Sequence, residues 1–258
     1  MMFKLGKKPA REDAVKLKFA SYFKSASLPI PPMIFGTPWL IQQWGPLGNL
    51  DYGDCVWAGA AHETMLLRAE ASASVPTFTS KTVLADYAAG TAVPGPAFNP
   101  SDPTTDNGTD VQTAAAYRQN TGIIDLFGNR HKIEIYTALH VGDLSQLALA
   151  TYLLGATGIG VNLPSSAEDQ FNRAEPWDVV QGDTSVGGHY IPCVGRNGHG
   201  NYLFVTWGRL QAATPAWVKA NMDEGIAYVS AERLNTQGLS PEGFNSTALL
   251  DDFKQVTA

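Results

Sequence analysis

The chain has 258 residues, 44% of them hydrophobic and 16% charged, a composition typical of a globular protein with one large domain or two small ones. No run of the sequence approaches the about 20 consecutive apolar residues of a membrane span, and the basic N-terminus is not followed by the apolar segment of a signal peptide. We therefore expect neither a membrane protein nor one secreted by a signal peptide. The two cysteines are too few for a disulfide framework and have no neighbouring ligands at zinc spacing, so no metal site and no cofactor is predicted.

The net charge of -6 is unevenly distributed along the chain. Residues 1–24 carry seven basic and two acidic side chains, a net charge of +5, whereas the remaining residues carry a net charge of -11. A basic arm on an acidic body is expected to dock on that body or on a neighbouring subunit. Nucleic acid is a less favoured partner, because the arm lacks interleaved aromatic stacking residues and an Arg cluster.

The first part of the chain is predicted to be mainly helical. Residues 1–33 are expected to form an arm with one short helix at about 14–23, because the prolines at its end fix an extended backbone. A loop rich in Gly, Pro and Trp leads to a helix over about 54–70, for which Asp54 is a favourable N-cap. Beyond it, the pattern predicts a long surface loop over 91–110, a helix over 111–120, a strand over 132–139 and a helix from Asp143 or Ser145 to residue 154.

The second part of the chain is predicted to be antiparallel sheet. Runs rich in β-branched and aromatic residues predict strands at residues 158–163, 190–194, 202–206 and 225–230, with a tight hairpin at 196–200. A helical half followed by such a half describes an α+β protein with two lobes. The expected division is an arm over 1–33 and a domain over 34–258, which comprises a helical lobe at about 34–155, a β lobe at about 156–235 and a C-terminal tail over 236–258.

Cys55 is the first candidate for chemistry. It stands at the start of the helix predicted over 54–70, where unpaired backbone N–H groups and the positive end of the helix dipole favour a thiolate. The alternative is a buried structural cysteine, which is the commoner fate of a lone Cys.

His189 is the second candidate. It follows Gly187 and Gly188 and precedes the strand predicted at 190–194, and from there an imidazole can lean across a cleft and accept a proton from Cys55. The alternative is a histidine that bonds a local backbone carbonyl. Since both residues occur in this order on these elements, the pair predicts a thiol-based nucleophilic site.

The sequence around both residues resembles the papain-like cysteine peptidases. In that family Cys opens the central helix and Trp-Ala follows, which is similar to Gly53-Asp54-Cys55-Val56-Trp57-Ala58, with Val56 inserted. The family's His box, Trp-Gly pair and closing strand are similar to Gly187-Gly188-His189, Trp207-Gly208 and Glu224-Gly225-Ile226-Ala227. The resemblance spans residues 48–230 and implies a papain-like two-lobed α+β fold, in which a helical lobe with the Cys helix packs against an antiparallel β-sheet lobe.

Two further positions of the family can be carried over. Its oxyanion-hole Gln corresponds to Asn49, whose amide can donate an N–H to an oxyanion, although Asn49 also suits a turn. Its His-orienting Asn corresponds to Val205, which cannot accept an imidazole N–H. Thr206 is adjacent but is expected to point to the opposite side of the strand, so the third member of a triad is predicted to be missing or to come from elsewhere.

The remaining histidines and the second cysteine are predicted to be structural. His62 is expected to be a core histidine, and Cys193 is expected to pack inside the sheet. Three other histidines have no ligand partners at usable spacing or lie at a hairpin tip, namely His131, His140 and His199.

Functions of two different classes fit these residues. The first is a thiol hydrolase in which Cys55 attacks a carbonyl, His189 moves the proton, and Asn49 with the Cys55 backbone N–H holds the oxyanion. The resemblance implies a peptide or isopeptide bond as its substrate.

The second function is structural. A basic arm before a papain-like body also resembles proteins encoded by phages and prophages, which implies a weakly active or inactive virion component whose arm binds neighbouring subunits. Val205 favours this hypothesis, whereas Cys55 and His189 favour the enzyme. A peptide-binding or small-molecule-binding module is a third alternative. We also expect the protein to be located in the cytoplasm of a bacterial host or in a virion, and we expect it to form a homo-oligomer.

Overall fold

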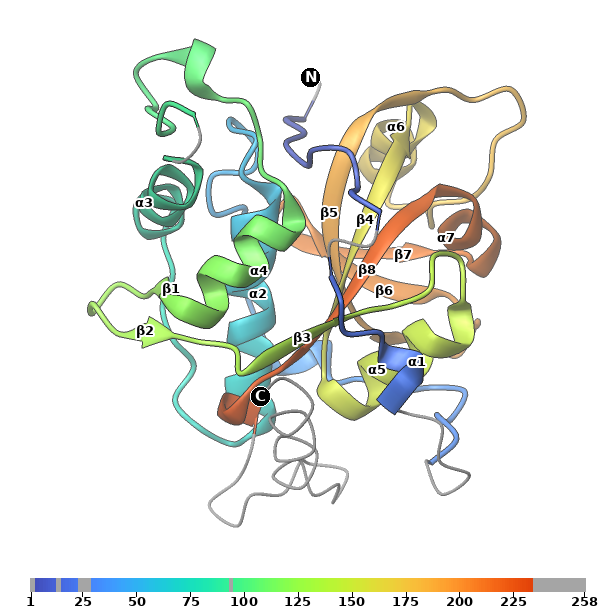
Figure 1. Cartoon of the computed structure of the whole chain (residues 1–258). Helices are drawn as coiled ribbons and strands as arrows, with labels where there is room; N and C mark the ends of the chain where they lie inside the picture. Colours follow the sequence, from blue (N-terminus) through green and yellow to red (C-terminus); the bar gives the residue numbers. More distant parts are fainter. Residues whose placement is uncertain (1–2, 13–14, 23–28, 93–94, 234–258) are drawn as a thin grey trace.

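The computed structural model describes residues 3–12, 15–22, 29–92 and 95–233, and its centre is a six-stranded antiparallel sheet (Figure 1). The strands follow one another in space in the order β3-β8-β4-β5-β6-β7. They are β3 (Ile135–Ala138), β4 (Thr157–Pro164), β5 (Ser185–Arg196), β6 (Tyr202–Thr206), β7 (Arg209–Ala213) and β8 (Met222–Val229). A separate two-stranded sheet contains β1 (Ile123–Ile124) and β2 (Arg130–His131).

Helices lie on both sides of this sheet (Figure 1). One group comprises α2 (Cys55–Glu70), α3 (Ser80–Thr91) and α4 (Val111–Asn120), and the other comprises α5 (Leu144–Leu154), α6 (Ser166–Asn172) and α7 (Pro215–Asn221). Shorter turns are α1 (Phe19–Tyr22), η1 (Pro38–Leu40), η2 (Pro103–Thr105) and η3 (Ala231–Arg233). Among the described residues, no helix has both the length and the apolar character that crossing a membrane requires.

The pleat of the strands separates two cores. On β5, Tyr190 and Val194 pack with the α2–α4 group, whereas Ile191 and Cys193 pack with the α5–α7 group, because successive side chains of a strand point to opposite faces. Helix α5 therefore packs with the sheet, although it precedes residue 155. The division of the chain into an arm and lobes at residues 33 and 155 stays a prediction.

Helix α2 lies unusually close to β5 because Gly59 faces the sheet. A Cβ at Gly59 would lie only 2.5 Å from the ring of Tyr190. Next to this contact, Glu63 accepts a hydrogen bond from the Tyr190 hydroxyl at 2.6 Å and forms an ion pair with Arg118 at 2.6 Å. The guanidinium of Arg118 lies 4.1 Å from the ring centroid of Tyr228. This buried cluster fixes the helices of one group to β5 and β8.

Several predicted elements are confirmed, and others are found that the sequence patterns did not indicate. The helices expected at 54–70 and 111–120, the helix ending at 154 and all four strands of the second part are present. Asp54 occupies the N-cap position of α2 but makes no side-chain cap hydrogen bond, because its backbone (φ -100°, ψ 18°) is not extended. Helices and strands without a sequence prediction are α3, α6, α7, β1, β2 and β7. The tail predicted over 236–258 lies outside the described residues.

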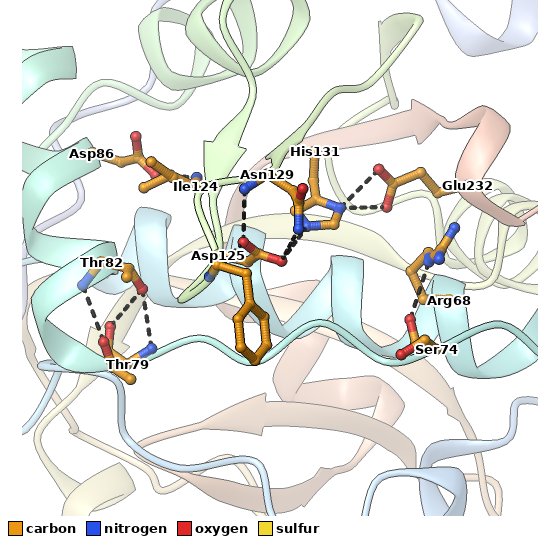
Figure 2. A network of polar contacts seen from close by, with 11 residues as sticks. Arg68, Ser74, Thr79, Thr82, Asp86, Ile124, Asp125, Asn129, His131 and Glu232 are labelled. Carbon is orange, nitrogen blue, oxygen red and sulfur yellow. Dashed lines mark hydrogen bonds and ion pairs between the residues drawn. The ribbon is translucent and has the colours of Figure 1, made fainter.

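Figure 2 shows a polar network that holds the β1–β2 hairpin in place. Asp86 of α3 accepts the backbone N–H of Ile124 at 2.7 Å, and His131 of β2 contacts Glu232 of η3 at 2.9 Å and Asp125 at 3.4 Å. Burial alone would lower the pKa of His131, but its hydrogen bonds with both carboxylates raise it above the ordinary histidine value. The network therefore connects the hairpin to the chain that follows β8.

Candidate active site

Cys55 is the first residue of α2 and is 2% exposed. Backbone N–H groups of Tyr190 and Gly6 hydrogen-bond its sulfur, so the thiol lies against β5 beside His189. We expected the helix start to favour the thiolate. Burial raises the thiol pKa to about 12, because it outweighs both the helix start and the two N–H groups, which lower the pKa. In the described state Cys55 is a neutral thiol.

His189 lies inside β5 rather than ahead of a strand, and it is completely buried. Its Nε2 is 2.7 Å from Oγ1 of Thr206, while no described residue hydrogen-bonds Nδ1. Burial lowers the pKa of His189 to about 3, so the imidazole is neutral. With Nδ1 unprotonated, Nε2–H donates to Thr206 and Nδ1 is left as a base.

The position of Thr206 corrects the sequence prediction. Phe204 pairs directly with Cys193 across β5 and β6, and both belong to the core on the α5–α7 side. Thr206 is two residues from Phe204, and His189 is four residues from Cys193, so both side chains lie on that same face. Val205 instead packs with the α2–α4 group. The prediction that Thr206 points away from His189 was therefore wrong, and the imidazole has a partner.

Trp207 covers the outer side of the imidazole. Its ring stacks on His189 with centroids 4.9 Å apart and an interplanar angle of 19°. Trp207 and Gly208 form the two-residue turn between β6 and β7, with φ of 46° and 85°. A left-handed backbone is strained for a bulky residue such as Trp, and here it accompanies an indole that shields the His189–Thr206 contact.

Asn49 closes the turn that precedes the nucleophile. Its side-chain amide donates to the backbone carbonyl of Tyr52 at 3.2 Å, and its side chain is buried. Next to it, burial raises the pKa of Asp54 well above its usual range, which favours a neutral carboxyl beside the thiol. The turn function of Asn49 is present in the structure, and its oxyanion role stays a prediction.

Residues 3–9, here called the cleft segment, run between the two halves of this site. Figure 1 shows this part of the chain in dark blue, passing between α2 and α4 on one side and the strands on the other. Gly6 accepts the N–H of Thr109 through its carbonyl oxygen at 2.6 Å, and Lys7 donates its backbone N–H to Gly188 at 3.1 Å. Phe3 stacks on Trp207 with centroids 4.4 Å apart. The segment thus connects the loop before α4 with strand β5 directly over the thiol.

The fit of the cleft segment depends on a glycine at position 6. A Cβ there would lie 1.8 Å from the carbonyl oxygen of Gly53, a backbone atom of the turn before Cys55. Lys7 completes the contact with its buried ammonium group, which donates to Asp223 at 2.8 Å and pairs with Glu224 at 3.1 Å. The expected docking of a basic arm on an acidic body is therefore intramolecular for these residues.

The structure places Cys55 at the start of α2 and His189 in β5, one residue before the Tyr190 N–H that contacts the sulfur. Their catalytic roles stay a prediction, and the structure adds residues that the sequence patterns did not identify. These are Thr206, the cleft segment and the carboxylates of Asp223 and Glu224. Thr206 could have been found from the register of the β5–β6 hairpin, because Thr206 and His189 each lie an even number of residues from the paired Phe204 and Cys193. For the cleft segment, the sequence offered only its positive charge. His62 bonds the carbonyl of Gly45 at 2.9 Å and is a core residue as predicted. Among the described residues, no group of three or more His, Cys, Asp or Glu side chains is arranged to hold a metal ion.

The chain matches no protein-family model and no curated relative by sequence. Among solved structures, it is similar to xylellain, a cysteine protease from Xylella fastidiosa, with 14% identity, a TM-score of 0.62, and coverage of 89% of this chain and 98% of xylellain. It is also similar to the ragweed pollen cysteine protease Amb a 11 in its proform (14% identity, TM-score 0.58, 85% and 72% coverage). A third similar structure is the Carica candamarcensis cysteine protease CMS1MS2 (12% identity, TM-score 0.54, 77% and 99% coverage). The predicted papain-like α+β fold is confirmed.

Proposed function

We propose that this protein is a papain-like thiol hydrolase of peptide or isopeptide bonds, with Cys55 as nucleophile and His189 as proton acceptor. The observation that carries the proposal is the arrangement of the imidazole. Thr206 holds Nε2, Trp207 covers the ring, and no described residue hydrogen-bonds Nδ1. The sulfur of Cys55 accepts the backbone N–H of Tyr190, the residue that follows His189. A base held in one orientation beside a thiol at a helix start is the arrangement that nucleophilic catalysis requires.

In the proposed reaction, the thiol proton of Cys55 passes to Nδ1 of His189 while the sulfur attacks the carbonyl carbon of the amide. The tetrahedral oxyanion is held by the backbone N–H of Cys55, which as first residue of α2 has no intrahelical partner, and by the amide of Asn49 after it releases Tyr52. Collapse expels the amine, which takes the proton from His189, and leaves a thioester. Water then attacks the thioester, His189 takes its proton, and the carboxylic acid and the free thiol are released.

The cleft segment must leave before this reaction can start. It contacts the thiol through Gly6 and packs with Phe3 on Trp207, which stacks on the imidazole. Burial of the thiol and the imidazole opposes both charged forms, thiolate and imidazolium. The bound segment is also unsuitable as a substrate, because the N–H of Gly6 meets the sulfur. A sulfur that accepts this N–H lies near the plane of the peptide group, whereas attack on a carbonyl carbon comes from above that plane.

The test is peptide hydrolysis by the full chain with Gly6→Val, in which the added side chain collides with the Gly53 backbone and expels the segment. We expect this variant to hydrolyse an unspecific fluorogenic peptide mixture, wild type to be at least about tenfold slower because the competent state is rare, and Cys55→Ala in the Gly6→Val background to be inactive. The matched control is Gly95→Ala, whose Cβ meets nothing within 4 Å. An inactive Gly6→Val variant with a freely reactive Cys55 would contradict the proposal.

One observation favours the structural alternative. Both members of the dyad are uncharged in the described state, as expected of a site that no longer performs chemistry. In this alternative the protein is an inactive component of a phage virion, present in the virion or in its bacterial host, and residues 1–33 bind neighbouring copies. Analytical ultracentrifugation distinguishes the two: the alternative requires an oligomer that deletion of residues 1–33 weakens, and it predicts no gain of hydrolysis from Gly6→Val.

A further inference from the structure

The cleft segment places one side chain in a ready-made cation site next to the thiol. The ammonium group of Lys7 is 0% exposed and donates to Oδ2 of Asp223 at 2.8 Å and to the carbonyl of Lys8 at 2.9 Å, with Oε1 of Glu224 at 3.1 Å. Two of its three contacts are therefore carboxylates of β8, and only one comes from the cleft segment itself.

Two glycines shape the site for a long unbranched side chain. A Cβ at Gly160 of β4 would lie 2.0 Å from Cε of Lys7. The aliphatic part of the lysine side chain therefore fills the space that a larger residue at position 160 would occupy. A Cβ at Gly188 of β5 would lie 2.3 Å from the carbonyl oxygen of Lys7, so this glycine admits the backbone of whatever chain lies in the cleft. We call the four residues around Lys7 the lysine subsite, namely Gly160, Gly188, Asp223 and Glu224.

The carboxylate of Glu224 is held in place independently of Lys7, whereas one oxygen of Asp223 is left without a described partner. Oε2 of Glu224 accepts the side-chain amide of Gln112 at 2.9 Å, and no described group hydrogen-bonds the buried Oδ1 of Asp223. Both residues also line a cavity of about 540 Å³ between residues 10–12 and 15–20 on one side and the strands β3 and β8 on the other. When the cleft segment leaves, water can enter from this side. Burial and the neighbouring Asp223 raise the pKa of Glu224, and a cation at the subsite favours the charged form of both carboxyl groups.

The subsite lies one residue away from the reacting centre. Gly6 contacts the thiol through its N–H, and the positive charge of Lys7 is near enough to lower the pKa of Cys55. In a bound substrate, one residue would lie at the sulfur of Cys55, as Gly6 does. A lysine directly before or after that residue would bring its ammonium group to the lysine subsite.

We propose that the lysine subsite selects substrates, so that the enzyme cleaves chains carrying a lysine directly beside the residue whose carbonyl is attacked. This inference rests on the proposed hydrolase function. Lys7 occupies the subsite in the described state, and a substrate lysine replaces it when the cleft segment is displaced. Asp223 and Glu224 are thereby specificity-determining residues, and neither contacts the reacting atoms.

The experiment uses the full chain with Gly6→Val and internally quenched peptides of the forms Ala-Ala-X-Gly-Ala-Ala and Ala-Ala-Gly-X-Ala-Ala, with X as lysine, arginine, norleucine or glutamate. We expect lysine to exceed norleucine in kcat/KM by about 10- to 100-fold in one of the two series, because norleucine leaves the carboxylates unpaired. Adding Asp223→Asn and Glu224→Gln should reduce this ratio to about one. The matched control, Asp169→Asn on the exposed face of α6, should keep the ratio. If Gly6→Val does not fold, Lys7→Glu serves instead, since its charge is repelled by the same carboxylates.

Failure of the inference and failure of the proposed function give different results. Hydrolysis with equal rates for lysine and norleucine overturns the lysine subsite and leaves the hydrolase. If no peptide is cleaved, fluorescence anisotropy of the same labelled peptides decides: tighter binding of the lysine peptide supports the subsite and contradicts the hydrolase, and equal binding overturns both.

Discussion

Strand β8 contributes to two buried ionic clusters that differ in what covers them. In the first, Glu63 and Arg118 pair within the core, and Tyr190 and Tyr228 surround them. In the second, Lys7 pairs with two carboxylates of β8. The first cluster is covered by helices of the core, whereas the second is covered by a segment that enters from the start of the chain.

This difference shows that residues of the same sheet can be buried either by the core helices or by a segment that can detach. Tyr190 and His189 are neighbours on β5, yet the first is buried by α2 and the second by Trp207 and by the residues that the cleft segment holds in place. Removing the core cover unfolds the protein. Removing the cleft segment should only return water to the dyad, which reverses the pKa shifts of Cys55 and His189.

The largest expected effect breaks the core cluster. Arg118→Met leaves Glu63 as an uncompensated buried charge and should lower the free energy of unfolding by about 3–5 kcal/mol. Lys7→Met should lower the free energy of unfolding by only about 1 kcal/mol or less, as for an exposed pair. The reason is that the cleft segment can detach, and water can then hydrate the carboxylates of Asp223 and Glu224. Urea denaturation measures both, with Arg11→Met at the exposed Asp110 pair as the control. Equal losses for Arg118 and Lys7 would mean that the cleft segment belongs to the core.

A second prediction concerns Thr206 as a positioning residue. In the Gly6→Val background, Thr206→Val removes the partner of Nε2 and should lower kcat by about 10- to 100-fold, a part of what a general base contributes. Thr206→Ser should restore most of the activity. The pH profile of kcat should shift with Thr206→Val and not with Val205→Thr, since Val205 faces the other core. A pH profile that moves equally with both variants contradicts the assignment.

The third prediction uses two buried histidines. Burial lowers the pKa of His62 to about 4 and that of His189 to about 3. The unfolded chain binds these protons near pH 6.5 and the folded chain does not, so the free energy of unfolding should fall as the pH drops from about 6.5 to 4, by about 1.4 kcal/mol per pH unit for each histidine. His62→Gln should reduce the slope in wild type and in Gly6→Val alike. In Gly6→Val the His189 share should be smaller, because water reaches that imidazole; an unchanged slope would contradict this.

The smallest expected effect is a loss of stability as the pH rises, opposite in direction to the effect of His62 and His189. The pKa of His131 is raised, because its contacts with Glu232 and Asp125 outweigh burial. Its contribution to stability is therefore present below about pH 6.5 and is lost as the pH rises through the raised value, and for this half-buried group it is about 1 kcal/mol or less. Thermal denaturation at pH 5.5 and 8.5 should show that His131→Gln costs stability only at the lower pH. His140→Gln, at an exposed site, is the control.

Local patterns were sufficient for the elements that carry the dyad. The helix that begins at Cys55 and the strand that contains His189 have the periodicity and flanking glycines that their environments require, and the resemblance ordered them correctly. Helix α3 had no prediction, although Thr79 and Thr82 form a reciprocal capping box at its start. Its apolar face is short, because Asp86 is buried there for the polar network of Figure 2.

Contacts between distant residues were not predictable in the same way. The partner of His189 depends on the register between β5 and β6, which is irregular between Cys193 and Gly195. The electrostatics of Cys55 depend on where residues 3–9 lie, and no pattern within that segment specifies a cleft about 50 residues further along the chain. The helix dipole argument was locally sound, and the burial imposed by another segment overrode it.

The most direct measurement is the rate of iodoacetamide labelling of the two cysteines, followed by mass spectrometry in wild type and Gly6→Val. Cys193 is the internal control, because it is buried in the sheet and burial raises its thiol pKa to about 11. We predict that both thiols are protected in wild type, and that Gly6→Val makes Cys55 reactive at neutral pH while Cys193 stays protected. Cys55 that stays as slow as Cys193 in the folded Gly6→Val protein would contradict a nucleophile covered by a removable segment.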